Sequence, residues 1–357
     1  MLIDAENLLR QSVEMRASDV FIGAGRQPFF KIEGVLVPQG GDRMSAVEAE
    51  DFIRLLYAMA NRPIERFKQS GDDDFPVAVP GVARFRVNAY MQRGTAAAII
   101  RVVAFEIPDY KTMRIPEEVM HLATEKRGLL LVTGTAGSGK TTTLACIIDA
   151  INQARNCHIV TLEDPIEYLQ RDKKSLISQR EISADTESYM SALRASLRQA
   201  PDIILLGEMR DFETIRTAMT AAETGHLVIS TLHTVGAVTT LDRVIDVFPP
   251  DQQQQIRIQL SMVLVAVASQ RLIPDKNGGL IPTFEIMRLN SAIRNLIREG
   301  KTHQIDSVIQ TSAAEGMVSM DSYMVRLFKQ GLITAETALE NAVNEEQMKR
   351  RLDASGI

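Results

Sequence analysis

The sequence "LLLVTGTAGSGKTTT" occupies residues 129–143 and decides the fold, because it joins a strand signal to a helix signal through a glycine-rich turn. The apolar run at its start is typical of a buried strand, and the residues after the turn continue as a helix. Gly134, Gly139, Lys140 and Thr141 follow the P-loop spacing G-x-x-x-x-G-K-T, in the strand-to-helix context that this pattern requires. A chance glycine-rich turn is the alternative, and the agreement of spacing, strand and helix argues against it.

This loop predicts a site for nucleotide phosphates. A glycine-rich turn at a helix N-terminus lets consecutive backbone N–H groups point at phosphate oxygens. In such a loop Lys140 reaches the β and γ phosphates, and Thr141 supplies a hydroxyl ligand to Mg²⁺. We therefore expect ATP and Mg²⁺ as cofactors. The nucleotide-binding residues expected from the pattern are Gly134, Thr135, Ala136, Gly137, Ser138, Gly139, Lys140, Thr141 and Thr142.

Downstream of the loop, short apolar strands alternate with helical segments, as in "HIVTLED", "DIILLGE" and "HLVISTLH". Fully apolar strands alternating with helices predict an α/β fold with a mostly parallel sheet covered on both faces. From about residue 282 onward, short helices dominate to the end.

The first hundred residues predict a small α+β domain. A helix is expected over residues 4–15, and the capping box formed by Ser45 and Glu48 opens a helical stretch that runs to residue 67. Strands are expected over residues 19–22, 28–38, 83–92 and 95–104. The predicted organisation is an N-terminal domain over 1–105, a linker over 106–117, the P-loop core over 118–288 and a helical region over 289–357.

Two acidic residues follow the apolar strands that come after the P-loop. Glu163 ends "HIVTLED", and Glu208 follows "DIILL". Ligands of open α/β sheets bind at the carboxyl ends of the strands, and hydrolysis needs an oriented water and stabilised charge, so both acids are candidates for catalysis. Surface capping or ion pairing is the commoner fate of a carboxylate and is the alternative.

Two histidines, His226 and His233, flank a further strand, "LVISTL". Seven residues apart on a strand, they lie roughly 20 Å or more from each other on opposite faces, so they are not a metal-binding pair. His233 is nearer to the expected nucleotide, and His226 could reach a different surface. The residues alone leave both roles open.

Composition excludes several classes of function. The net charge of −5 provides no basic field for non-specific binding of nucleic acid, so nucleic acid is disfavoured as a partner. The two cysteines form no C-x-x-C pair, which favours a reducing compartment over a disulfide framework. The start of the chain lacks the apolar region of a signal peptide, and no run reaches the length of a membrane span. We therefore expect a cytoplasmic protein with no membrane span of its own.

The motifs together resemble the secretion ATPase superfamily. The order of the P-loop, "TLEDPIEY", "DIILLGEMRD" and "AAETGHLVISTLHT" is similar to the Walker A, Asp box, Walker B and His box of that superfamily. "SAIRNLIREGK", at residues 291–301, resembles a signature of its PilT-like branch, the type IV pilus retraction motors. The resemblance implies a homohexameric ring whose subunits have an N-terminal PAS-like domain and a RecA-like P-loop ATPase domain with C-terminal helices.

The resemblance also implies roles for individual residues. It gives Glu163 as the residue that polarises the attacking water and Glu208 as the Walker B acid that supports Mg²⁺ together with Thr141. It favours His226 over His233 as the residue that links nucleotide state to neighbouring groups. Arg86 and Arg101 match arginines that reach a γ-phosphate across a subunit boundary, although such side chains could also simply solvate a sheet face.

The segment that follows the core reads as an amphipathic helix, with Ser291 as its expected cap. Ala292, Ile293, Leu296 and Ile297 share one face at helical spacing, which leaves a polar face for coupling. The expected coupling residues are Ala292, Ile293, Arg294, Asn295, Leu296, Ile297, Arg298 and Glu299.

The resemblance implies a motor at the inner face of the cytoplasmic membrane that drives pilus retraction by acting on an inner-membrane platform protein. A paralogous retraction ATPase is a further expected partner, because "SDVFI" near the start and the C-terminal tail are similar to the PilU branch. The alternatives are a pilus assembly or type II secretion ATPase, a weakly hydrolysing regulatory ring and, least compatible with the acidic charge, a nucleic-acid translocase.

Overall fold

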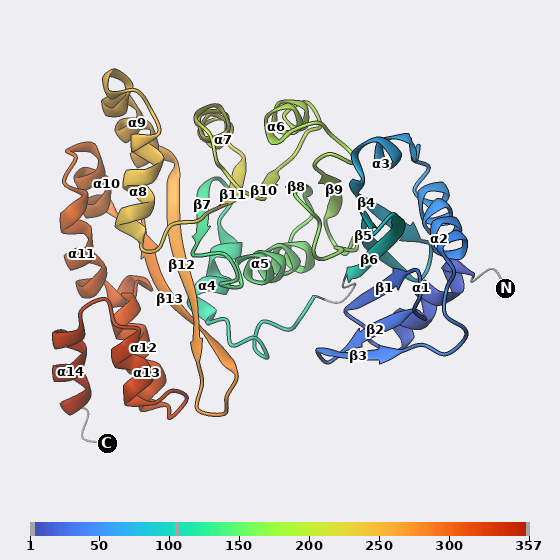
Figure 1. Cartoon of the computed structure of the whole chain (residues 1–357). Coiled ribbons are helices and arrows are strands. Elements are labelled where there is room, and N and C mark those ends of the chain that lie inside the picture. Colours follow the sequence, from blue (N-terminus) through green and yellow to red (C-terminus); the bar gives the residue numbers. More distant parts are fainter. Residues whose placement is uncertain (1–3, 104–106, 355–357) are drawn as a thin grey trace. The chain divides into compact units, whose positions relative to one another are not determined.

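The computed structural model describes residues 4–103 and 107–354, and these form two compact units (Figure 1). Within the described ranges, the first unit contains residues 4–103 together with Glu167–Leu169, and the second contains Ile107–Ile166 and residues 170–354. None of the helices in the described ranges is both long and apolar enough to cross a membrane.

In its described residues, the first unit is an antiparallel sheet of six strands in the order β3-β2-β1-β6-β5-β4, accompanied by three helices. Along β5, every second side chain from Ala83 to Ala89 is buried, which is the period expected when one face of a sheet packs against a core. The elements are α1 (Ala5–Glu14), β1 (Asp19–Gly23), β2 (Phe29–Ile32), β3 (Val35–Pro38), α2 (Ala46–Met59), α3 (Glu65–Ser70), β4 (Asp72–Val79), β5 (Ala83–Gln92) and β6 (Thr95–Val103).

Local signals explain most of these boundaries. The capping box of Ser45 and Glu48 starts α2 as expected, and the turn at Arg93 and Gly94 joins β5 to β6 with both residues at positive φ. Two expectations were wrong: the stretch 28–38 is a hairpin of two strands, and the helical stretch that starts at residue 45 is broken between α2 and α3. The strand β4 was not predicted.

The second unit is built on a sheet of seven strands in the order β13-β12-β7-β11-β10-β8-β9. The strands from β12 to β9 are parallel, and β13 pairs with β12 in antiparallel orientation. The expected mostly parallel sheet is therefore confirmed. The strands are β7 (Gly128–Thr133), β8 (His158–Glu163), β9 (Leu176–Glu181), β10 (Ile203–Leu206), β11 (Leu227–Leu232), β12 (Leu264–Pro274) and β13 (Leu280–Arg288).

Helices cover both faces of this sheet. In β7, Leu129 and Leu131 join the core under α6 to α11, whereas Leu130 and Val132 join the core under α4, α5 and the last three helices. Figure 1 shows α6 and α7 on one side of the sheet and α5 on the other. The helices are α4 (Glu117–Met120), α5 (Lys140–Ala154), α6 (Tyr189–Ser196), α7 (Phe212–Glu223), α8 (Ala237–Asp246), α9 (Pro250–Val263), α10 (Ser291–Arg298), α11 (Ile305–Thr311), α12 (Met320–Lys329), α13 (Ala335–Glu340) and α14 (Glu345–Asp353).

The strands β9, β12 and β13 were not predicted. In particular, helices were expected from about residue 282, and the structure instead continues the strand β13 to Arg288. Between Arg288 and the last described residue, 354, the chain forms five α-helices, α10 to α14, with short 3-10 turns between some of them.

Candidate nucleotide-binding site

The P-loop connects β7 to α5, and two of its glycines, Gly134 and Gly139, lie close to Gln270. A Cβ atom at Gly134 would lie 2.2 Å from the backbone oxygen of Gln270, and one at Gly139 would lie 2.8 Å from its Nε2 atom. Both glycines have positive φ, 147° and 86°, where side chains other than hydrogen are strained. Gly139 is also the N-cap of α5, so the helix N-terminus faces the loop.

The side chain of Lys140 is held over the P-loop by two backbone carbonyl groups of that loop. The side chain is 8% exposed, and its Nζ atom donates to the carbonyl oxygens of Gly134 at 2.9 Å and Thr135 at 2.7 Å. An ammonium group at this place is positioned to attract a phosphate anion bound in the loop.

The loop also offers hydroxyl groups. The Oγ atom of Ser138 is buried and has no hydrogen-bond partner within the described part of the chain. A buried polar group is normally paired, so this hydroxyl fits a site that a ligand completes. Thr141, in the first turn of α5, is only partly buried, and its hydroxyl is of the kind that coordinates Mg²⁺ in P-loop sites.

Glu163 and Glu208 lie at the edge of the sheet from which the P-loop starts, because β7, β8, β10 and β11 run parallel. Glu163 is the last residue of β8, and Glu208 comes two residues after the end of β10. The Oε1 atom of Glu163 accepts hydrogen bonds from Thr161 Oγ1 at 2.6 Å and from Gln179 Nε2 at 3.0 Å. Its carboxylate is thus oriented by two neighbours.

Glu208 is more deeply buried and lies between two basic side chains. It is 9% exposed, its Oε1 atom lies 2.5 Å from Arg210 Nη2, and its Oε2 atom lies 3.5 Å from His233 Nε2. The hydrogen bond and the charge of Glu208 raise the pKa of Arg210. A carboxyl group in a buried position needs polar partners, and these two were not predicted from the sequence as partners of Glu208.

Tyr189, on α6, lies beside the backbone that precedes Glu208. Burial raises the pKa of its phenol, and the carboxylates of Glu208 and Asp164 raise it further, so the hydroxyl stays protonated. A Cβ atom at Gly207 would lie 2.8 Å from the Tyr189 oxygen, which shows how closely the phenol approaches the backbone before Glu208. Sequence reasoning missed this tyrosine, because no motif marks it.

The two histidines lie at opposite ends of β11. His226 precedes the strand, where its Nδ1 atom lies 2.9 Å from the carbonyl oxygen of Ala221, and its own carbonyl accepts a hydrogen bond from the Gly128 N–H at the start of β7. It is therefore at the edge of the sheet away from the P-loop of its own chain. His233 follows the strand and lies beside Glu208.

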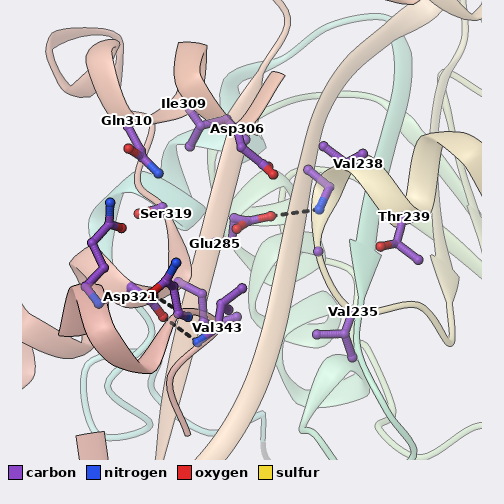
Figure 2. Close-up of a pocket in the computed structure, with 15 residues that line it drawn as sticks. Val235, Val238, Thr239, Glu285, Asp306, Ile309, Gln310, Ser319, Asp321 and Val343 are labelled. Carbon is purple, nitrogen blue, oxygen red and sulfur yellow. Dashed lines mark hydrogen bonds between the residues drawn. The ribbon is translucent and has the colours of Figure 1, made fainter. Parts of the chain in front are cut away.

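The backbone that follows His233 leads into α8, which is fixed by a buried acid. The first N–H of α8, that of Ala237, donates to Glu285 Oε1 at 2.7 Å (Figure 2). Glu285 lies on β13 and lines a pocket of about 460 Å³ that Asp306 and Asp321 also line. Burial raises the pKa of Glu285, although the N–H of Ala237 opposes this shift.

In the first unit, Arg86 and Arg101 are directly opposite each other on β5 and β6. Arg101 Nε lies 3.0 Å from Asp19 Oδ1, and Arg86 Nε lies 3.7 Å from Asp74 Oδ1. The Arg101 side chain is 69% exposed. The pair therefore shares one face of the first unit's sheet, with each guanidinium beside an acid.

The helix α10 carries the expected coupling residues. Asn290, not the expected Ser291, is its N-cap, because the Asn290 side chain accepts from the N–H of Ile293. Ile293 and Ile297 are fully buried, whereas Ala292 is exposed, contrary to the expected face. Leu296 packs against the same core as the isoleucines. Four of the expected polar residues are partly or fully exposed, namely Arg294, Asn295, Arg298 and Glu299.

Comparison with known proteins agrees with this architecture. Residues 2–347 match a family model described as Type II/IV secretion system protein. The chain is 43% identical over 341 residues to the Type IV pilus retractation ATPase PilT of Pseudomonas aeruginosa, covering 95% of this chain and 98% of that one. It is 35% identical over 348 residues to the type IV pilus ATPase PilU of the same organism, covering 97% and 91%.

A solved structure gives the same result in three dimensions. The crystal structure of the pilus retraction motor PilT with bound ADP matches with a TM-score of 0.88 and 43% identity, covering 97% of this chain and 98% of that chain. The expected fold, an N-terminal α+β domain followed by a P-loop ATPase domain with C-terminal helices, is confirmed. The chain belongs to the Type II/IV secretion system protein family.

Proposed function

We propose that this chain is an ATP-hydrolysing motor that powers the retraction of type IV pili. The observation that carries the proposal is the likeness to pilus retraction ATPases over almost the full length of both chains, together with the P-loop and the two strand-end acids. The identity is higher to the PilT protein than to the PilU protein, 43% against 35%, so the PilT branch is the better supported of the two.

In this proposal the nucleotide binds with its phosphates in the loop of residues 134–142. Lys140 attracts the β and γ phosphates, and Ser138 and the loop amides donate hydrogen bonds to phosphate oxygens. The hydroxyl of Thr141 and the carboxylate of Glu208 are hard oxygen donors that suit Mg²⁺, which would neutralise phosphate charge there.

Glu163 polarises the attacking water. Its carboxylate is oriented by Thr161 and Gln179, which holds the remaining oxygen atom in a defined direction. A base or water-orienting group must be in hydrogen-bond reach of the water, and a fixed carboxylate at the end of the strand next to the Walker B strand is suited to this. His233, beside Glu208, is placed to respond to charge at that carboxylate.

The remaining residues would act between subunits of a homohexamer. Arg86 and Arg101 would reach the γ-phosphate of a neighbouring subunit, where a guanidinium stabilises transition-state charge. His226, away from the P-loop of its own chain, would relay nucleotide state to neighbouring groups. The exposed side of α10 would couple hydrolysis to an inner-membrane platform protein, with the ring held at the cytoplasmic face of the membrane and able to work with a paralogous retraction ATPase.

Two measurements test the proposal. The purified chain should hydrolyse ATP, and Lys140→Ala or Glu208→Ala should abolish turnover; unchanged turnover in both variants would contradict the site. A strain in which the gene is deleted should carry long pili that do not retract. A strain without any pili would instead indicate an assembly ATPase, and normal retraction in the deletion strain would indicate a regulatory ring.

A further inference from the structure

We propose that Gln270, on β12, is a positioning residue that holds the P-loop in its phosphate-binding conformation. Gln270 is 2% exposed, and it belongs to no motif of the nucleotide site. It contacts the P-loop and α5 at three places, and each contact is made by a different group of the residue. The inference rests on the proposed nucleotide site and names one more residue that determines its affinity.

The first contact is through the side-chain oxygen. Thr143 Oγ1, in the first turn of α5, donates a hydrogen bond of 2.7 Å to Gln270 Oε1. Thr143 is completely buried, so neither group can exchange this partner for water. A hydrogen bond between buried groups is costly to break on one side only, because the remaining group then stays unpaired.

The other two contacts are with the glycines of the loop. The backbone oxygen of Gln270 lies against Gly134, and its Nε2 atom lies against Gly139, so close that a Cβ atom at either glycine would overlap with it. The glutamine thus touches the first and the last glycine of the P-loop and the helix that follows. Lys140 closes the same loop from inside through the carbonyl oxygen of Gly134.

Gln270 is itself held rigidly. The preceding residue, Ser269, pairs with Thr133, the last residue of β7, and Gln270 pairs with Phe284 on β13. The backbone of Gln270 is held by its pairing with β13, and that of the residue before it by the pairing with β7, so Gln270 can in turn hold the loop that it touches. Since the N–H groups of the loop must already point inward to bind phosphate without a reorganisation cost, loosening this contact should weaken nucleotide binding more than the chemical step.

The test uses the purified full-length chain and measures ADP affinity by calorimetry in the presence of Mg²⁺, and ATP turnover at saturation. Gln270→Leu and Thr143→Val should each weaken ADP binding by about tenfold and raise KM for ATP similarly, with kcat changed less than about twofold. Thr143→Ser, which keeps the hydroxyl, should restore affinity. The double variant Gln270→Leu with Thr143→Val should be no weaker than the worse single variant, because one interaction is lost only once.

A matched control is available on the neighbouring strand. Thr283 is also fully buried, and its Oγ1 atom donates to the carbonyl oxygen of Arg271, the residue after Gln270. Thr283→Val also removes a buried threonine hydrogen bond, in this case to a backbone carbonyl, without touching the P-loop. It should lower the unfolding temperature and leave ADP affinity unchanged.

Unchanged ADP affinity in Thr143→Val, or an equal loss of affinity in Thr283→Val, would overturn the proposal. Because valine has nearly the same shape as threonine, Thr143→Val still tests the proposal if Gln270→Leu does not fold. The outcome is separate from that of the retraction proposal: a wild-type chain that fails to bind ADP contradicts the nucleotide site itself, whereas ADP-binding variants of normal affinity contradict only the role of Gln270.

Discussion

Arg101 is proposed to act on the nucleotide of a neighbouring subunit, which an ATPase that works as a single chain would not require. Its guanidinium lies beside Asp19 on the first unit's sheet and is largely exposed, so this ion pair contributes at most about 1 kcal/mol to stability. In the proposed role, the Arg101 guanidinium stabilises the charge of a phosphate that is bound by a neighbouring copy of the chain.

Replacing Arg101 by alanine should therefore leave ADP binding intact and lower ATP turnover by on the order of 10³-fold, the scale of an arginine that stabilises phosphoryl transfer. ADP titration and steady-state turnover of the same preparation check this. The control Arg54→Ala removes an exposed arginine from α2 in the same unit and should change neither quantity. Wild-type turnover in Arg101→Ala would refute the assignment.

At this scale, sequence predicts residues that belong to motifs and misses residues defined only by contact. Lys140, Glu163 and Glu208 stand at fixed places relative to strands, so their location at one sheet edge follows from the parallel topology. Gln270 and Tyr189 have no such pattern. Their positions depend on which strand lies beside β7 and on how α6 packs, and periodicity does not encode either.

Among the elements, α10 offers the clearest separation of structure from function. Ile293 and Ile297 attach it to the core, and its polar side chains lie outside. Charge reversal by Arg294→Glu should leave ATP turnover within about twofold, because α10 adds no residue to the P-loop site, and should abolish pilus retraction. An assay of ATP turnover checks the first expectation, and the size of twitching zones checks the second.

The control for this prediction is Ile297→Ala, which should destabilise the chain by about 2–5 kcal/mol and lower both activities through loss of folded protein. If Arg294→Glu also lowers turnover and retraction in parallel, α10 is a structural support and not a coupling element.

Glu285, on β13, is predicted to make the stability of the chain depend on pH. Burial raises its pKa above the ordinary value of 4.5, the N–H groups of Ala237 and Met320 oppose the shift, and the carboxylates of Asp306 and Asp321 add to it. A carboxyl whose pKa is raised by folding costs stability as pH increases from the ordinary value through the raised one. The unfolding temperature of Glu285→Gln relative to wild type should therefore increase as pH rises above about 4.5 and then level off.

Glu118 serves as a control, because folding shifts its pKa in the opposite direction to that of Glu285. Burial alone would raise its pKa, but the hydrogen bond and charge of Arg326 lower the pKa below the ordinary value. Glu118→Gln should consequently lose stability relative to wild type as pH rises. Identical pH profiles for the two variants would show that neither carboxyl is tuned by its surroundings in this way.

The elements that were missed share a physical cause. The strand β4 begins with three aspartates and contains Pro76, signals against a strand, but it lies at the edge of its sheet, where proline is tolerated. The strand β9 is also an edge strand and largely polar. Central strands such as β7 and β11 are fully buried and apolar, and their sequence therefore identified them.

In the proposed ring, each active site of the whole molecule uses residues from two subunits. If Arg101 acts on a neighbouring subunit's nucleotide, a mixture of Arg101→Ala and Glu208→Ala chains contains sites with an intact acid from one variant and an intact arginine from the other. Mixing the two inactive variants should therefore restore measurable ATP turnover.

A mixture of Lys140→Ala and Glu208→Ala chains is the matched control, because both changes damage the site that their own P-loop forms and no intact site can arise. Turnover that does not recover in the first mixture, or that recovers equally in the control, would contradict sharing of active sites between subunits.

In the proposed function, ATP hydrolysis by this chain drives pilus retraction. Retraction of individual fluorescently labelled pili can be recorded in the deletion strain after complementation with either the wild-type gene or the Glu208→Ala variant at equal protein levels. Wild type should restore retraction, and the variant should leave pili extended. Retraction at wild-type speed with Glu208→Ala would contradict the account.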